Sequence, residues 1–140
     1  MENKYQITLE SVSSKPGFEP ETYELTTTGV LTVAKDGSYK ISYNETDSSG
    51  SLFENIVTAK GDMTASVSRM GIYGSSFTLD TDKKQLCVVK TPFGELCLGV
   101  LTHTIKNDLT KDGGELFLQY TLDANNRYLC DNEVKLKVTI

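Results

Sequence analysis

Glu45 and Arg69 are the residues of this sequence best placed to do chemistry, because each ends a row of alternating apolar residues. Side chains on a strand alternate between its two faces, so each charge shares a face with the apolar residues that precede it. The two apolar rows are Tyr39, Ile41 and Tyr43 before the glutamate, and Met63, Ala65 and Val67 before the arginine. We therefore expect two strands to send opposite charges inward, each at the end of an apolar row.

Three kinds of chemistry fit this pair. The first is a structural ion pair that closes one end of the fold. The second is an anchor for an anionic ligand, in which Arg69 donates hydrogen bonds and Tyr43 or Tyr120 assists. The third is catalysis by Glu45. The candidate ligand-binding residues are thus Arg69, Glu45, Tyr43 and Tyr120, and no residue is assigned a catalytic role.

The choice of arginine supports an inward position for residue 69. The sequence holds two arginines against twelve lysines. A guanidinium is planar and always charged, so it is the usual choice when a base must pair in a partly buried place.

The histidine and the cysteines predict neither a metal site nor a nucleophile. Cys87, Cys97, His103 and Cys130 include no pair at the short spacing of a zinc site. His103 and Cys97 are six residues apart on one expected strand, which separates them by about 20 Å. An odd number of cysteines without an export signal indicates reduced thiols, and we expect a cytoplasmic protein.

Charge and motifs exclude several function classes. The net charge is −5, and no cluster of Lys and Arg is present, so neither nucleic acid nor an anionic membrane is an expected partner. The longest apolar run, Leu96 to Leu101, is far too short to span a bilayer. The sequence has no phosphate-binding loop, no nucleophile elbow and no dinucleotide fingerprint, so no cofactor is predicted.

The composition predicts an all-β protein. Seventeen threonines stand against four alanines, a bias that favours strands over helices. Clusters of Gly, Pro, Asp and Asn recur at short intervals, as expected of an antiparallel meander of about eight to ten strands. These clusters are 15–17, 36–37, 47–50, 61–62, 80–83, 92–94, 112–114 and 123–126. We see no linker and no repeat, and expect a single domain over residues 1–140.

The alternation also predicts how the strands pack. It is clearest in the last two strands, where Leu116, Leu118, Tyr120 and Leu122 share one face, as do Val134, Leu136, Val138 and Ile140. With no amphipathic helix to cover them, these faces must pack on each other. A closed barrel does so and removes exposed edges, while a sandwich remains open as an alternative. Residues 51–59 show no clean alternation, and the sequence does not orient them.

Four short motifs are spread along most of the chain. They are Tyr43-x-Glu45, Arg69-x-Gly71, Thr91-Pro92-Phe93-Gly94-Glu95, and Gly114 leading to Tyr120. In this order they resemble the YwiB-like family of small bacterial proteins of unknown function. The resemblance implies a lipocalin-like (calycin-type) β-barrel in a bacterial cytoplasm, and it supplies no known catalytic residues.

Three functions follow from these observations. The first is a binding module whose interior holds a small, partly apolar or anionic ligand, which requires a cavity of roughly 300 Å³ or more. The second is a protein–protein interaction or regulatory module with a filled barrel, which an exposed apolar patch would favour. The third is an enzyme that uses the Glu45 and Arg69 end of the barrel. We rank them in that order.

Overall fold

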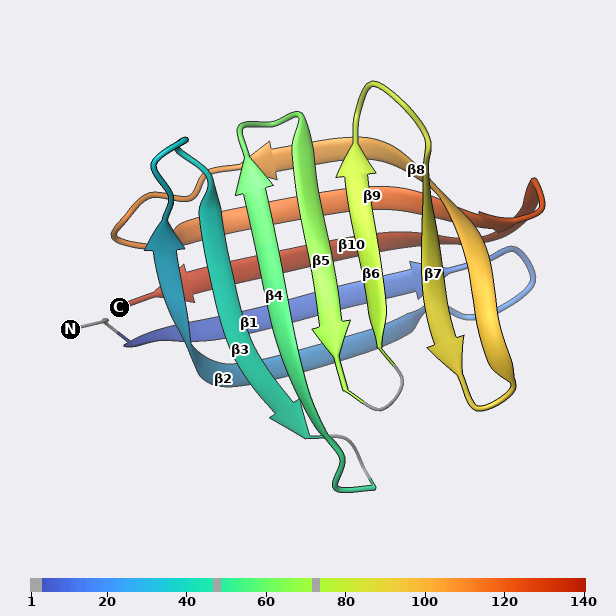
Figure 1. Ribbon diagram of the computed structural model, residues 1–140, viewed down its shortest axis with the longest axis horizontal. Coiled ribbons are helices and arrows are strands. Elements are labelled where there is room, and N and C mark those ends of the chain that lie inside the picture. Colours follow the sequence, from blue (N-terminus) through green and yellow to red (C-terminus); the bar gives the residue numbers. More distant parts are fainter. Residues whose placement is uncertain (1–3, 47–48, 72–73) are drawn as a thin grey trace.

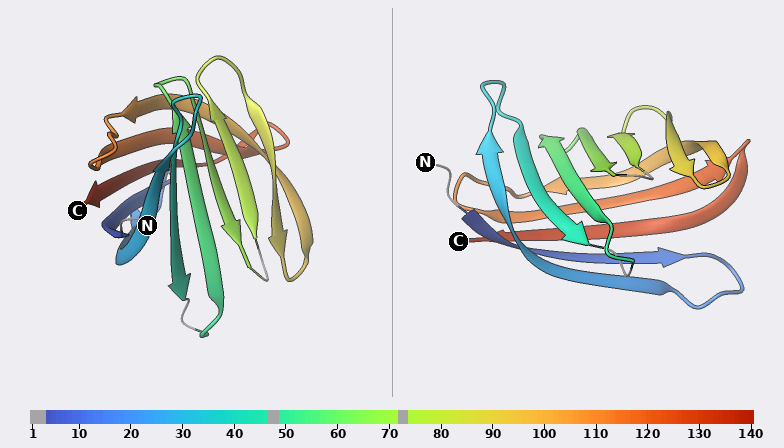
Figure 2. Two further views of the ribbon diagram at one scale, coloured as in Figure 1. Left: turned by 60° about the vertical axis from the view of Figure 1, so that its left-hand side comes forward. Right: turned by 60° about the horizontal axis from the view of Figure 1, so that its bottom comes forward.

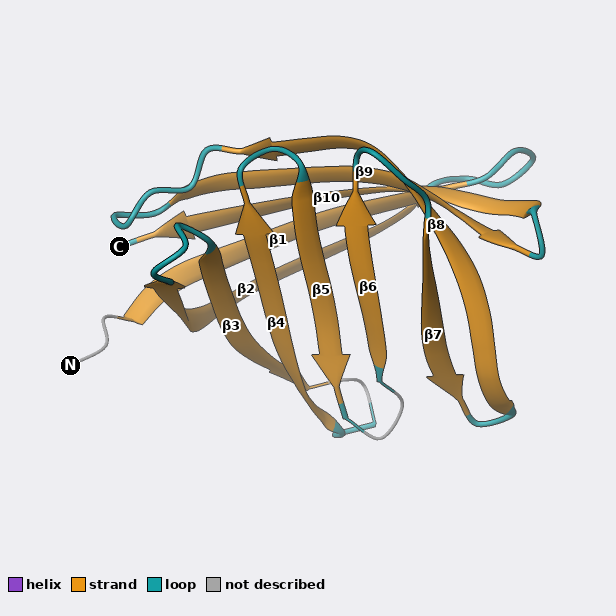
Figure 3. Cartoon of the chain, turned by 45° about the horizontal axis from the view of Figure 1, so that its top comes forward, coloured by secondary structure: helices purple, strands orange, loops and turns teal. Residues whose placement is uncertain are grey.

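Ten strands and the turns between them make up the described chain (Figure 1; Figure 3). The structure is a computed structural model that describes residues 4–46, 49–71 and 74–140. The strands are β1 (Lys4–Ser14), β2 (Glu21–Val33), β3 (Tyr39–Thr46), β4 (Leu52–Lys60), β5 (Thr64–Met70), β6 (Ser75–Asp80), β7 (Gln85–Thr91), β8 (Gly94–Asn107), β9 (Gly114–Ala124) and β10 (Arg127–Thr139). In the expected turn at 47–50, residues 47 and 48 lie outside the described residues.

The strands form a closed antiparallel barrel. Each strand pairs with its neighbours in the chain, and β1 pairs with both β2 and β10, which closes the sheet. This confirms the all-β barrel, and the sandwich is excluded. Among the residues that the structure describes, no helix has the length and apolar character needed to cross a membrane.

Two long strands, β2 and β8, bend, and this lets the single sheet close into two facing layers. β3 to β7 cross over the layer that contains β1, β9 and β10, while β2 and β8 curve from one layer into the other (Figure 2). β2 contains Gly29, where a Cβ atom would come within 2.4 Å of the Ser42 carbonyl oxygen. In β8 the pairing with β9 shifts register between Thr102 and Thr104. Glycines and bulges are the usual devices for such corners.

Most of the inward rows agree with the predicted alternation. Leu116, Leu118, Leu136 and Val138 are buried, and so are Ile41 and Tyr43. Two expectations are wrong. Met63 is 49 % exposed because it belongs to the turn before β5, which begins at Thr64. Ile140 is 83 % exposed because β10 ends at Thr139.

The structure also orients the segment that the sequence did not. β4 turns Phe53, Asn55, Val57 and Ala59 inward, and all four are buried. The alternation is hidden because a polar residue, Asn55, occupies the inward row, whereas the apolar Leu52 lies outside and is 65 % exposed.

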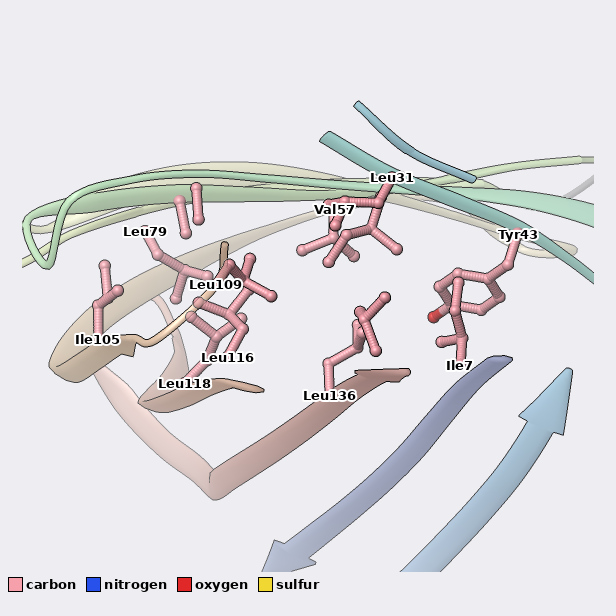
Figure 4. Packing of buried hydrophobic residues seen from close by; sticks show 14 of the residues in the cluster. Ile7, Leu31, Tyr43, Val57, Leu79, Ile105, Leu109, Leu116, Leu118 and Leu136 are labelled. Atoms are coloured by element: carbon pink, nitrogen blue, oxygen red, sulfur yellow. The ribbon is translucent and has the colours of Figure 1, made fainter. Parts of the chain in front are cut away.

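Part of the apolar core gathers away from Glu45 and Arg69. Ile105, Leu109, Leu116 and Leu79 gather into one apolar cluster, with Leu136 and Val57 farther along the interior (Figure 4). The pair Glu45 and Arg69 belongs to the opposite end, where β3 and β5 finish and β4 and β6 begin. Part of the core thus lies away from the end that carries Glu45 and Arg69.

The three cysteines are free thiols, with Cys87 buried, Cys130 partly buried and Cys97 exposed. Burial raises the pKa of the Cys87 thiol, so this residue is held in its neutral form. The cytoplasmic location stays a prediction.

Candidate functional site

A cavity of about 560 Å³ lies at the end of the barrel that carries Glu45 and Arg69. Its walls come from β1, β9 and β10 on one side and from β3 to β6 on the other, and β2 contributes Tyr23. They are lined by Leu9, Ser11, Tyr23, Tyr43, Glu45, Thr46, Asn55, Val57, Val67, Arg69, Ser75, Leu118, Tyr120, Asn132, Val134 and Leu136. The volume lies within the range of known small-molecule sites.

Strand register brings the polar side chains of the cavity together. Tyr43 stands opposite Asn55, and Asn55 stands opposite Arg69, so the three form one row across β3, β4 and β5. Glu45 pairs with Phe53 in the next inward row. Residues directly opposite one another in a sheet point to the same face. Three consecutive strands, β3, β4 and β5, therefore present one polar cluster.

The Glu45 carboxylate has partners for both of its oxygens. Its Oε1 accepts a hydrogen bond from Asn55 Nδ2 at 3.1 Å and lies 3.2 Å from Arg69 Nε. Its Oε2 accepts a hydrogen bond from the Tyr23 hydroxyl at 2.8 Å. The side chain is 12 % exposed. Burial and the hydrogen bond to Glu45 raise the pKa of Tyr23, so the phenol remains a donor.

Arg69 meets Glu45 with only part of its guanidinium. The buried Nε–H does not point at a hydrogen-bond acceptor among the described residues, so the contact is an ion pair without a hydrogen bond. The Cζ atom lies 3.8 Å from the centre of the Phe53 ring, in a cation–π arrangement. The side chain is 38 % exposed, and its ion pair with Glu45 runs through Nε.

The glycine of the Arg69-x-Gly71 motif makes room for the Phe53 ring. A Cβ atom at Gly71 would lie 2.4 Å from Phe53 Cδ1 and 2.7 Å from Phe53 Cε1. The ring is 4 % exposed and has little room to move. Glycine at position 71 therefore allows the Phe53 ring to lie where the Arg69 guanidinium stacks on its face.

Replacing Gly71 with alanine is expected to lower the free energy of unfolding by about 1–3 kcal/mol, the usual cost of overpacking. Urea denaturation measures the loss. The neighbouring Met70→Ala is the control, because Met70 is 46 % exposed and its loss should stay within about 0.5 kcal/mol. A Gly71→Ala loss no larger than that of the control would contradict the proposed packing.

Two tyrosines add hydroxyl groups to the cavity wall. Burial, followed by the Glu45 charge, raises the pKa of Tyr43 to about 12. Burial also raises the pKa of Tyr120 to about 12. Tyr43 points into the barrel (Figure 4). Neither hydroxyl forms a hydrogen bond with the described residues, so both remain able to donate to a ligand.

All four residues that the sequence proposed for ligand binding line this one cavity. The sequence did not propose Asn55, Phe53 or Tyr23 for the site. Tyr23 lies on the inward face that the alternation gives, so that pattern was the available signal. No comparable signal marked Asn55 and Phe53, because their strand lacks clean alternation.

His103 lies away from the cavity, on the outer face of β8. Its Nε2 is 2.6 Å from Thr121 Oγ1, and the Thr121 hydroxyl donates to Asp131 Oδ1 at 2.5 Å. Hydrogen bonds from Thr121 and Tyr128 lower the pKa of Asp131. No group of three His, Cys, Asp or Glu side chains within the described ranges is arranged to hold a metal ion.

Comparison with known proteins assigns the chain to a family. The family described as a domain of unknown function (DUF1934) matches residues 7–136. The chain belongs to this family. Among solved structures, the DUF1934 chain is similar to the ywiB protein from Bacillus subtilis, with 24 % identity and a TM-score of 0.83. The match covers 99 % of this chain and 92 % of that one, and it shows a shared fold. A search of the curated proteins finds no match.

Proposed function

We propose that the protein is a binding module that holds a small, partly apolar, anionic ligand in the barrel cavity. The observation that carries the proposal is the state of Arg69. Its buried Nε–H has no hydrogen-bond partner in the described chain, and its side chain lines a cavity of about 560 Å³ with largely apolar walls. Glu45, by contrast, already has partners for both oxygens. In this polar cluster, the group still free to form a hydrogen bond with a ligand is therefore the Arg69 donor and not the Glu45 acceptor.

The two tyrosines support the same conclusion. With a pKa of about 12, the Tyr43 and Tyr120 phenols stay neutral at physiological pH. Neutral phenols donate hydrogen bonds and do not repel an anion. The apolar side chains between them, including Val57, Leu118 and Leu136, would surround the rest of the ligand.

Native mass spectrometry of protein purified from its source tests the proposal. We expect a retained small molecule with acidic character in the wild type and its loss in Arg69→Leu. Arg127→Leu is the matched control, because Arg127 is the other arginine of the chain and lies exposed outside the cavity. Wild-type protein that carries no small molecule, and that gains no thermal stability from any member of an acid library, would contradict the proposal.

A role in protein–protein interaction is the second candidate, favoured by the β7–β8 hairpin. Three of its apolar side chains are strongly exposed: Leu86 at 72 %, Phe93 at 99 % and Leu96 at 53 %. The same mass spectra would show a retained protein partner in place of a small molecule.

A further inference from the structure

We propose that the cavity selects a monocarboxylate, and that Glu45 is the residue that rejects ligands with two negative charges. This inference rests on the proposed function and names its ligand class. Three observations carry it: the orientation of the Arg69 guanidinium, the charge balance of the cavity, and the nature of its walls.

The guanidinium offers one edge to a ligand. The Phe53 ring holds its plane at 3.8 Å, and Glu45 lies 3.2 Å from Nε. The Nε atom faces Glu45 without a hydrogen bond to it, and the edge formed by the two terminal nitrogens is not part of this ion pair. Two parallel N–H groups in one plane match the two oxygens of a carboxylate.

The charge balance of the cavity limits how much negative charge a ligand brings. Arg69 is the only basic side chain among the described residues that line it, and Glu45 already offsets that charge. The net attraction of this pair for an anion grows in proportion to the ligand charge. The cost of removing an ion from water grows with the square of its charge. A monoanion is thus favoured over a dianion.

The rest of the wall suits an apolar body of moderate width. Leu9, Val67 and Leu136 line the cavity together with the rings of Tyr43 and Tyr120. An aryl or branched aliphatic acid fits this lining, with its carboxylate on Arg69 and either phenol donating to a second acceptor.

Calorimetric titration with three matched probes at pH 8 tests the inference. The probes are para-butylbenzoate, its neutral amide para-butylbenzamide, and para-butylphenyl phosphate, which is a dianion at this pH. We expect the wild type to bind the benzoate at least about tenfold more tightly than either the amide or the phosphate. A hydrogen bond to a charged group is typically worth enough free energy for a tenfold difference in affinity. Arg127→Leu should keep the same order.

The variant Glu45→Gln tests the role assigned to Glu45. Glutamine keeps an oxygen to accept from Asn55 or Tyr23 and removes the negative charge. We expect the preference for benzoate over phosphate to shrink at least about fivefold, because the dianion gains more from the loss of a nearby negative charge. The wild-type comparison stands on its own if this variant does not fold.

Several results would overturn the inference. An amide that binds as well as the benzoate, or a phosphate that binds more tightly, would refute selection of a monocarboxylate and leave the cavity as a binding site. If none of the three probes binds but native mass spectra still show a retained small molecule, selection of a monocarboxylate is also refuted and the cavity remains a binding site. Failure of all three with no retained molecule would overturn the proposed function as well. An unchanged preference in folded Glu45→Gln would remove the role of Glu45.

Discussion

The protein is expected to lose about 4 kcal/mol of its free energy of unfolding as the pH rises from 10 to 12. The folded pKa values of Tyr43 and Tyr120 are about 12, against 10.0 for an unperturbed tyrosine. Between these values the unfolded chain has released the phenolic protons and the folded barrel has kept them. The unfolded state then binds fewer protons, so stability falls as the pH rises. A shift of about two pKa units is worth about 2.7 kcal/mol per tyrosine at about 1.4 kcal/mol per unit, and about 2 kcal/mol of this falls between pH 10 and pH 12.

Urea denaturation of Tyr43→Phe and Tyr120→Phe at pH 8 and pH 11.5 isolates this effect from the other groups that ionise in the same range. At pH 8 we expect each variant to lie within about 1 kcal/mol of the wild type, because neither hydroxyl has a partner in the described chain. At pH 11.5 each should be more stable than the wild type. Parallel losses in wild type and variants would show that these phenols ionise freely in the folded barrel.

Arg69→Leu is expected to lower the free energy of unfolding by about 2 kcal/mol in ligand-free protein. The change leaves Glu45, which is 12 % exposed, without its counter-ion. Removing one partner of a fully buried pair costs about 3–5 kcal/mol. The loss here is smaller because the Arg69 side chain is 38 % exposed, and because Tyr23 and Asn55 still donate to the carboxylate.

The double variant Arg69→Leu with Glu45→Gln should recover about half of that loss, since no unpaired charge remains. Chemical denaturation of the two single variants and the double variant gives the coupling energy. The pair Lys60 and Asp36 serves as control, because both side chains are more than half exposed, at 59 % and 56 %. Lys60→Ala should cost within about 0.5 kcal/mol. A similarly small loss for Arg69→Leu would refute a structural role for the ion pair.

The Arg69 site shows which features of the structure alternation along a single strand can predict. Alternation along one strand is a local property, so the sequence predicted that Glu45, Arg69, Tyr43 and Tyr120 point inward. Met63 is the exception in the row before Arg69, because the pattern does not reveal where a turn ends and a strand begins. The pattern also does not reveal a buried polar residue such as Asn55, because a polar residue on a strand is ordinarily read as facing the surface.

From its residue types and their spacing alone, this chain could be recognised as an antiparallel all-β domain with an inward arginine and glutamate. Their meeting was decided by strand register, which places Asn55 between Tyr43 and Arg69 and sets Glu45 beside Phe53. Closure by β1 on β10 and the space left inside were also decided in three dimensions. The reason is physical: pairing between strands depends on partners distant in the chain, and the volume of a cavity depends on side chains from many strands at once.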